Sequence, residues 1–170
     1  KAFTSNRIVK FVPGKTYTIS SQIDLPNKAV SLVCDGQATI KATAVMESMI
    51  KCVNFIEYPT YEGLTLDGAG FVDACMYIEL ANSPYFKRSH FKNAKRAPLI
   101  IGRTGHTGTS AYECRFSEMK ITGGEQWNTT AENIADYGIL VLTGASDNHF
   151  DDIIIKNVKL AGVKDNSTNN

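Results

Sequence analysis

Short runs of β-branched, aromatic and other apolar residues follow one another along the whole chain, each bounded by Gly, Asn, Asp or Pro. This pattern is typical of β-strands separated by turns. The clearest runs are 15–19, 29–33, 38–42, 63–66, 74–78, 98–101, 138–142 and 152–155. Helical periodicity is nearly absent, and only two short helices are expected, over 44–50 and 130–137, the second preceded by a capping box of Thr129 and Glu132. The pattern predicts an all-β protein with one or two short helices in its loops.

The runs contain an internal repeat. An aromatic residue is followed by two variable positions and then by alternating inward residues, and the motif closes on Gly or Asn. It first occurs over 61–68 and recurs over 86–93, 116–123 and 150–157, with starts 25, 30 and 34 residues apart. Repeats of this length are typical of solenoids, in which each coil packs on the next. The closing Gly or Asn is expected to take a positive φ in a sharp turn, because these residues do so at least cost.

A solenoid made of strands is a single-stranded right-handed parallel β-helix, which is therefore the predicted fold. About six coils are expected, over roughly 11–26, 27–46, 47–72, 73–97, 98–137 and 138–163. The β-helix domain is expected to span 1–163, as a fragment of a longer chain, and 164–170 is expected to be a polar tail. A β-sandwich is the structural alternative, but it should contain hairpin turns such as Asn-Gly, and the chain contains no Asn-Gly.

Three segments carry a resemblance to a known group. Residues 11–19, with Pro13-Gly14 before Tyr17 and Ile19, resemble the opening coil of pectate-lyase-superfamily β-helices, a group that includes phage tailspikes. Residues 31–40 are similar to the second coil of that group, and 61–68 to its Gly-Leu-Thr-Leu-Asp-Gly coil. Members are mostly polysaccharide lyases, glycoside hydrolases and glycan-binding tailspikes. The resemblance implies a partner that is a bacterial cell-surface polysaccharide, a homotrimer for the full-length chain, and a place in a virion tail or else outside the cell.

The repeat register predicts which outward side chains become neighbours on successive coils. One such column consists of Gly63, Arg88, Glu118 and Asp152, and the column before it of Glu62, Lys87, Ser117 and Asp151. Successive coils are about 4.8 Å apart. Glu118 and Asp152, flanked by Asp151, are therefore expected to form a carboxylate pair close enough for retaining glycoside hydrolysis, in which crowding of like charges raises one pKa. The alternative is a solvated charge ladder in which Arg88 offsets both acids.

Two functions other than glycoside hydrolysis are compatible with the sequence: a polysaccharide lyase and a non-catalytic module. In a lyase, the same acids could hold Ca²⁺ and Arg88 could serve as the base; otherwise no cofactor is expected. Asp151-Asp152 is similar to the paired Asp of polygalacturonase-like hydrolases, although the His and Arg-x-Lys motifs of that family are absent here. The third possibility is a non-catalytic module that supports a spike or binds its receptor.

Substrate-binding residues are expected beside these acids and in the longest inserted loop. The loop 123–130 carries Trp127, the only Trp, as a candidate sugar platform, with Glu125 positioned to hydrogen-bond sugar hydroxyls. Arg88 and Lys120 complete the predicted binding set. Tyr58, Tyr61 and Tyr137 are interpreted as packing residues.

Composition narrows the choice of partner. The 170 residues are 43% hydrophobic and 21% charged, as in globular proteins, and the net charge of +1 argues against nucleic acid as the main partner. No apolar run is long enough to suggest a membrane span. The four cysteines are widely spaced, without the clustering that zinc requires, and are expected to be buried free thiols. The three histidines lack metal-binding spacings.

Overall fold

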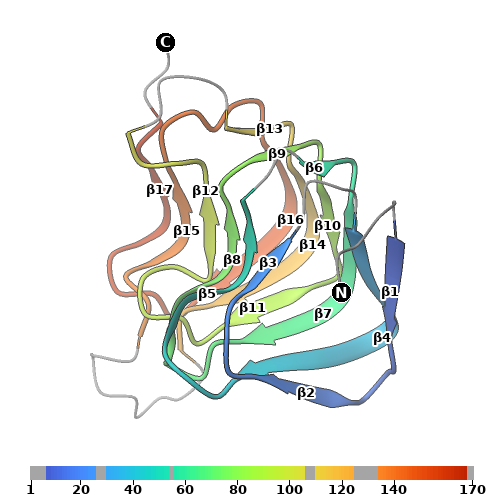
Figure 1. Ribbon diagram of the computed structural model, residues 1–170. Helices are drawn as coiled ribbons and strands as arrows, with labels where there is room; N and C mark the ends of the chain where they lie inside the picture. The colour runs from blue at the N-terminus through green and yellow to red at the C-terminus, as the bar shows by residue number, and fades with distance from the viewer. Residues whose placement is uncertain (1–6, 26–29, 54–55, 106–109, 125–133, 168–170) are drawn as a thin grey trace.

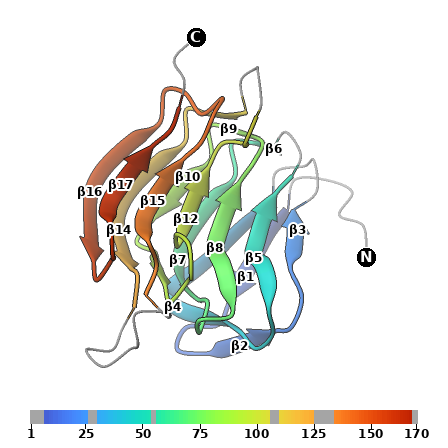
Figure 2. The same ribbon diagram turned by 90° about the vertical axis from the view of Figure 1, so that its left-hand side faces the viewer.

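The computed structural model describes residues 7–25, 30–53, 56–105, 110–124 and 134–167. They form a right-handed parallel β-helix of about five turns, close to the six expected, in which every strand pairs in parallel with the strand of the next coil (Figure 1). The coils stack along one axis, with the first described coil at one extreme and the last at the other (Figure 2). None of the described residues is helical, and accordingly none belongs to a helix that could span a membrane.

Three parallel sheets form the walls of the solenoid. The largest consists of β1 (Arg7–Phe11), β2 (Thr16–Ile19), β4 (Val30–Ala42), β7 (Thr60–Asp67), β10 (Tyr85–Lys87), β11 (His90–Lys92), β14 (Arg115–Thr122) and β16 (His149–Lys156). The second consists of β3 (Ile23–Leu25), β5 (Met46–Cys52), β8 (Val72–Ile78), β12 (Leu99–Ile101), β15 (Tyr137–Val141) and β17 (Ala161–Asp165). The smallest consists of β6 (Ile56–Glu57), β9 (Ala81–Asn82) and β13 (Ala111–Tyr112). We call these the large, second and small sheets.

The helix expected over 44–50 is wrong. Met46–Cys52 form strand β5, which pairs with both β3 and β8 and buries Met49, Ile50 and Cys52. Pairing on both edges outweighs the local helix preference of the segment. Of the second expected helix, residues 130–133 lie outside the described residues and Tyr137 begins β15. Strand β17 ends at Asp165, two residues into the segment expected to be a tail.

The register predicted from the repeat is confirmed. Tyr61 pairs with Phe86, Phe86 with Phe116, and Phe116 with Phe150. Their rings stack inside the solenoid, with centroids 4.6, 4.9 and 5.0 Å apart. The first three rings are buried, whereas Phe150 on the last coil is 41% exposed. The aromatic residues of the repeat therefore form a continuous stack that runs through the core from coil to coil.

A sharp corner divides each long strand of the large sheet into two limbs. The residues at this corner form one column and all have φ between 48° and 69°: Gly63, Arg88, Glu118 and Asp152. A second column of positive φ, made by Tyr58, Ser83, Glu113 and Asp147, turns the chain between the small and large sheets. Each coil repeats the same bend, so a left-handed residue recurs at the same place. For residues with a Cβ this conformation costs about 1–2 kcal/mol each.

The expectation for the closing residue of the repeat is correct for Asn and wrong for Gly. Asn93 and Asn157 have positive φ, but Gly68 and Gly123 do not. At Gly123 an added Cβ would lie 2.1 Å from the carbonyl oxygen of Asn157, and at Gly68 it would lie 2.7 Å from that of Asn93. These two glycines are needed because the neighbouring coil passes too close for a side chain.

The core is continuous from coil to coil and contains the cysteines. All four are buried free thiols, as expected. A second, smaller apolar cluster lies on the opposite face of the second sheet and contains Tyr77, Ile100, Leu140 and Leu142. Side chains alternate between the two faces of a strand, so β12 and β15 are buried on both sides. Outward positions of this sheet are therefore not uniformly polar.

Candidate functional site

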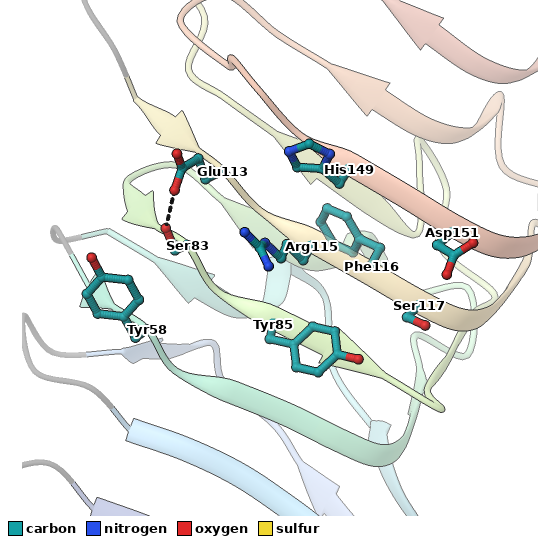
Figure 3. A pocket seen from close by; sticks show the side chains of 9 residues that line it. All are labelled: Tyr58, Ser83, Tyr85, Glu113, Arg115, Phe116, Ser117, His149 and Asp151. Atoms are coloured by element: carbon teal, nitrogen blue, oxygen red, sulfur yellow. Dashed lines mark hydrogen bonds between the residues drawn. The ribbon is translucent and has the colours of Figure 1, made fainter.

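One cavity is a groove of about 900 Å³ across four neighbouring coils, which we call the strand groove. Figure 3 shows its lining residues on β10, β14 and β16 and at the adjoining corner, and all of them except Phe116 of the buried ladder lie on the outward face. They are Tyr58, Ser83, Tyr85, Glu113, Arg115, Phe116, Ser117, His149 and Asp151. Volumes of this size are typical of ligand sites.

The strand register places the groove residues. Tyr85, Arg115 and His149 are paired across β10, β14 and β16, and each immediately precedes an inward aromatic of the ladder. Because side chains alternate along a strand, the buried ladder forces these three to point outward. Ser117 and Asp151 form the next outward column. The groove therefore combines an aromatic ring, a guanidinium, an imidazole, a hydroxyl and a carboxylate.

The corner end of the groove holds a hydrogen-bonded carboxylate. Glu113 accepts a hydrogen bond from the Ser83 hydroxyl at 2.9 Å. This bond, followed by one from Tyr112, lowers the pKa of Glu113, and the pKa of Tyr112 is raised because its hydroxyl binds the ionised acid. Glu113 and Asp151 lie at opposite ends of the groove (Figure 3), so they do not form a close carboxylate pair.

A smaller cavity, of about 390 Å³, lies beside the corner that divides the two limbs of the large sheet. We call it the corner cleft. It is lined by Gln37, Thr65, Arg88, Ser89, His90, Glu118 and Lys120. Arg88 and Glu118 reach it because they stand at the corner with positive φ, while Thr65, His90 and Lys120 form one outward column of the second limb.

The structure divides the sequence-predicted site residues between the two cavities. Asp151 lines the strand groove, and Arg88, Glu118 and Lys120 line the corner cleft. Asp152 stands at the same corner position as Glu118, one coil further along, and both acids are exposed. Glu125 and Trp127 lie outside the described residues.

The expected charge partners at the corner are wrong. Arg88 does not offset Glu118 and Asp152; its guanidinium binds Glu62 at 2.5 Å. Glu118 instead faces Lys87, with 3.5 Å between the carboxylate oxygen and the ammonium nitrogen. Both pairs are diagonal, because each joins a corner residue to the residue before the corner on a neighbouring coil.

Sequence reasoning missed most of the strand groove. It interpreted Tyr58 as a packing residue, but this side chain is 68% exposed and lines the groove, whereas Tyr61 is buried as expected. Tyr85, Arg115 and His149 were not predicted as site residues, although the position before each repeat aromatic marks them as an outward column. The repeat does not predict the turn between the small and large sheets, which brings Tyr58 and Glu113 beside this outward column.

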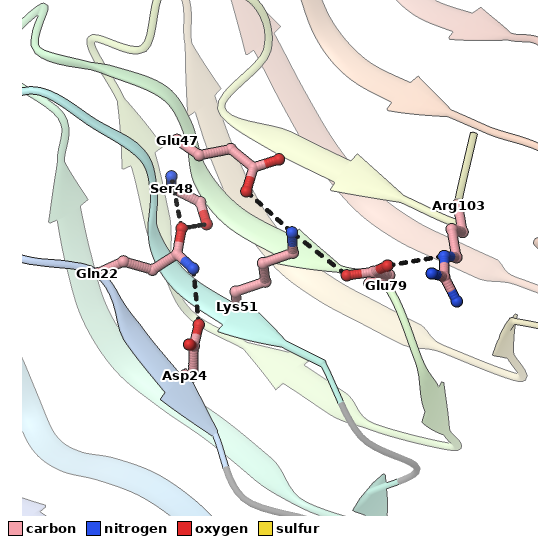
Figure 4. Close-up of polar contacts among 7 residues, drawn as sticks. All are labelled: Gln22, Asp24, Glu47, Ser48, Lys51, Glu79 and Arg103. Carbon is pink, nitrogen blue, oxygen red and sulfur yellow. Dashed lines mark hydrogen bonds and ion pairs between the residues drawn. The ribbon is translucent and has the colours of Figure 1, made fainter.

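A polar network on the second sheet braces its strands rather than forming a cavity (Figure 4). Lys51 binds Glu47 at 2.9 Å and Glu79 at 3.3 Å, and it lies 4.6 Å above the ring of Tyr77. Glu79 also binds Arg103 at 2.9 Å. Burial lowers the pKa of Lys51, but the hydrogen bonds to Glu47 and Glu79 outweigh it and the pKa is raised. The ammonium therefore stays charged as a link between coils.

No three His, Cys, Asp or Glu side chains in the described ranges are placed to hold a metal ion together. Comparison with protein-family models, with curated proteins and with solved structures finds no match to this chain. The fold is therefore established by the structure, and the function has to be argued from the two cavities.

Proposed function

We propose that this protein is a polysaccharide-binding β-helix module and that the strand groove is its glycan site. One observation carries the proposal: an open groove across four coils presents exposed Tyr58 and half-buried Tyr85 together with hydroxyl and carboxylate groups and the Arg115 guanidinium. Sugars have apolar faces and polar edges, and tyrosine offers both an apolar ring and a hydrogen-bonding hydroxyl.

The polar groups have complementary roles in this proposal. Arg115 donates hydrogen bonds, Glu113 and Asp151 accept them at the two ends, and Ser117 does either. Successive coils are about 4.8 Å apart, so the same chemistry is presented repeatedly along the solenoid axis. A polymer of repeating units can contact such a surface at several points at once.

The biological setting belongs to the same proposal. The partner is a bacterial cell-surface polysaccharide, the assembly is a homotrimer in the full-length protein, and the location is a virion tail, with an extracellular location as the alternative. The resemblance of residues 11–68 to tailspike β-helices and the β-solenoid fold support this setting. Light scattering of the full-length protein should give three times the mass of one chain; a monomer would contradict the trimer.

A binding experiment tests the glycan site. The chain is titrated with a panel of capsular and O-antigen polysaccharides, and Tyr85→Ala is compared with Phe71→Ala, which removes an exposed ring outside the groove. Loss of a stacking ring should weaken binding about tenfold, or about 1.4 kcal/mol. Binding that is equal in the two variants, or absent for every polysaccharide, would contradict the proposal.

Cleavage of the bound glycan is the second candidate function. It is favoured by the placement of Glu118 and Asp152 at equivalent corner positions of adjacent strands, about 4.8 Å apart, which suits a retaining hydrolase. Reducing ends released from a bound polysaccharide should disappear in Glu118→Gln and in Asp152→Asn. Products with unsaturated ends would indicate a lyase instead, and binding without any products would leave a purely binding module.

A further inference from the structure

The corner cleft has a charge arrangement that the strand groove lacks. At its rim the charges of Arg88 and Glu118 are each balanced by an ion pair, with Glu62 and Lys87 respectively. Lys120, in contrast, forms no ion pair with any residue in the described part of the chain. Once these pairs are counted, one uncompensated positive charge remains at the cleft, and it belongs to Lys120.

Neutral donors line the same cleft, at least two strands away from Lys120. The hydroxyl oxygen of Thr65 accepts a hydrogen bond from the side-chain amide of Gln37 at 3.0 Å. In this bond Thr65 is the acceptor, so its own hydroxyl hydrogen is still available to donate to a ligand. Thr65 is 8% exposed and pairs in register with His90, which in turn pairs with Lys120. The donors therefore stand on one column of three successive strands.

The backbone makes these positions rigid. The column belongs to β7, β11 and β14, which are hydrogen-bonded to one another, and the inward residues beside it, Leu64, Leu66, Phe91 and Ile121, are buried in the core. Ser89 anchors the corner by accepting from the Leu64 amide and donating to the Lys87 carbonyl. Groups that are held in place before a ligand arrives lose little entropy on binding.

We infer that the corner cleft binds an oxyanion, with the Lys120 ammonium as its charge partner and the Thr65 hydroxyl and Gln37 amide as neutral donors. Lysine is an established phosphate-binding side chain, and it acts as a point charge that needs further donors to fix the anion. The only acid lining the cleft, Glu118, is engaged by Lys87. Arg88 contributes donors that its single bond to Glu62 does not use.

The cleft adjoins the strand groove through β14, where Ser117 lines the groove and Glu118 and Lys120 line the cleft. Taken with the proposed function, on which this step rests, a glycan lying in the groove can place an acidic substituent in the cleft. The preferred ligand is then a polysaccharide that carries carboxylate, sulfate or phosphate groups.

The cleft is tested first with inorganic phosphate, which requires no glycan. The labelled chain is titrated with sodium phosphate at constant ionic strength while the backbone amide resonances are followed by NMR. Saturable shifts are expected around Thr65, Ser89 and Lys120. They should be lost in Lys120→Gln, kept in Lys120→Arg, and kept in Lys164→Gln, which removes an exposed lysine from the second sheet. Shifts that do not saturate, or that survive Lys120→Gln, would overturn the inference.

A second measurement separates the cleft from the groove. Dextran, carboxymethyl dextran and dextran sulfate are compared as probes that share a backbone and differ in charge, together with any polysaccharide that binds in the panel. Lys120→Gln should weaken binding of acidic polymers at least several-fold and leave neutral ones unchanged, whereas Tyr85→Ala should weaken both. Phosphate binding without any glycan binding would reject the proposed function and keep the oxyanion site. Glycan binding that does not depend on the charge of the polymer would keep the proposed function and reject the oxyanion site.

Discussion

At the scale of single residues, glycine can be required in a turn for two different reasons: its left-handed backbone conformation, or the lack of space for a Cβ. Gly63 shares its left-handed conformation with Arg88, Glu118 and Asp152, so the conformation alone does not require glycine. The space around it does, because a Cβ on Gly63 would lie 2.3 Å from the carbonyl oxygen of Cys34. Strand β4 passes closest to the corner at this coil, and only the absence of a side chain allows it.

Substitution of two glycines separates these reasons. Gly14 has a φ of 72° and nothing within 4 Å of the position of an added Cβ, whereas Gly63 has a φ of 69° and two carbonyl oxygens within 2.5 Å. Gly14→Ala should lower the free energy of unfolding by about 1 kcal/mol, the cost of a Cβ in this conformation. Gly63→Ala should cost at least about 2 kcal/mol more, because backbone atoms have to move. Urea unfolding measures both, and equal losses would contradict the predicted clash.

At the scale of elements, the aromatic ladder joins strands that are distant in the sequence. Phe86 and Phe116 each stack on two rings, and Phe150 stacks on one. Stacking adds about 0.5–1.5 kcal/mol per pair to the burial of the ring itself. The contribution of a ring therefore depends on its coil, although the repeat makes all the aromatic positions look equivalent.

The ladder predicts a graded effect of ring removal. Phe116→Ala removes a ring that is 1% exposed and leaves a cavity between two neighbours, so it should lower the free energy of unfolding by about 3–5 kcal/mol. Phe150→Ala removes a ring that is 41% exposed and should cost less than half as much. Denaturant unfolding of the two variants gives the comparison, and the opposite ranking would show that the last coil is better packed than its exposure indicates.

At the scale of the whole molecule, stability is shared along one continuous core whose first and last described coils are more exposed than the central ones. Core-facing hydrophobic side chains are exposed on the first coil, at Ile23, and on the last, at Phe150 and Val163. Terminal repeats of a solenoid contact only one neighbour and therefore contribute less than central ones. The central coils contain three cysteines and a tyrosine whose pKa values are raised by burial: Cys52, Cys75, Cys114 and Tyr61.

This core predicts destabilisation at alkaline pH. Burial raises the pKa of Cys52 and of Cys75 from 9.0 to about 12 and also raises that of Cys114. Between about pH 9 and 12 the unfolded chain loses these protons while the folded chain keeps them, so deprotonation favours unfolding and stability falls as pH rises. The expected slope is about 1.4 kcal/mol per pH unit for each thiol.

Urea unfolding at several pH values from neutral to alkaline measures this slope. Cys75→Ala is the control, because its slope should be smaller by the contribution of one thiol even though the variant starts from a lower stability. A free energy of unfolding that stays constant or increases above pH 9 would contradict the prediction.

The sequence determined by itself the fold class, the coil register and the core. The spacing of Tyr61, Phe86, Phe116 and Phe150 was sufficient for this, because parallel coils bury the same repeat position and one aligned column aligns all the others. Strand β5 escaped prediction because its pairing partners lie on other coils.

Only the tertiary structure decided where the candidate sites lie. The repeat placed Glu118 and Asp152 in one column, but it did not reveal that this column is a corner, that Lys87 faces Glu118, or that Tyr58 turns into a groove with Arg115 and His149. The register of the strands follows from which side chains are buried, and the local pattern of apolar and polar residues is sufficient to predict it. Cavities depend on the angles between limbs and on side chains that meet across coils, and these arise only when the whole solenoid is assembled.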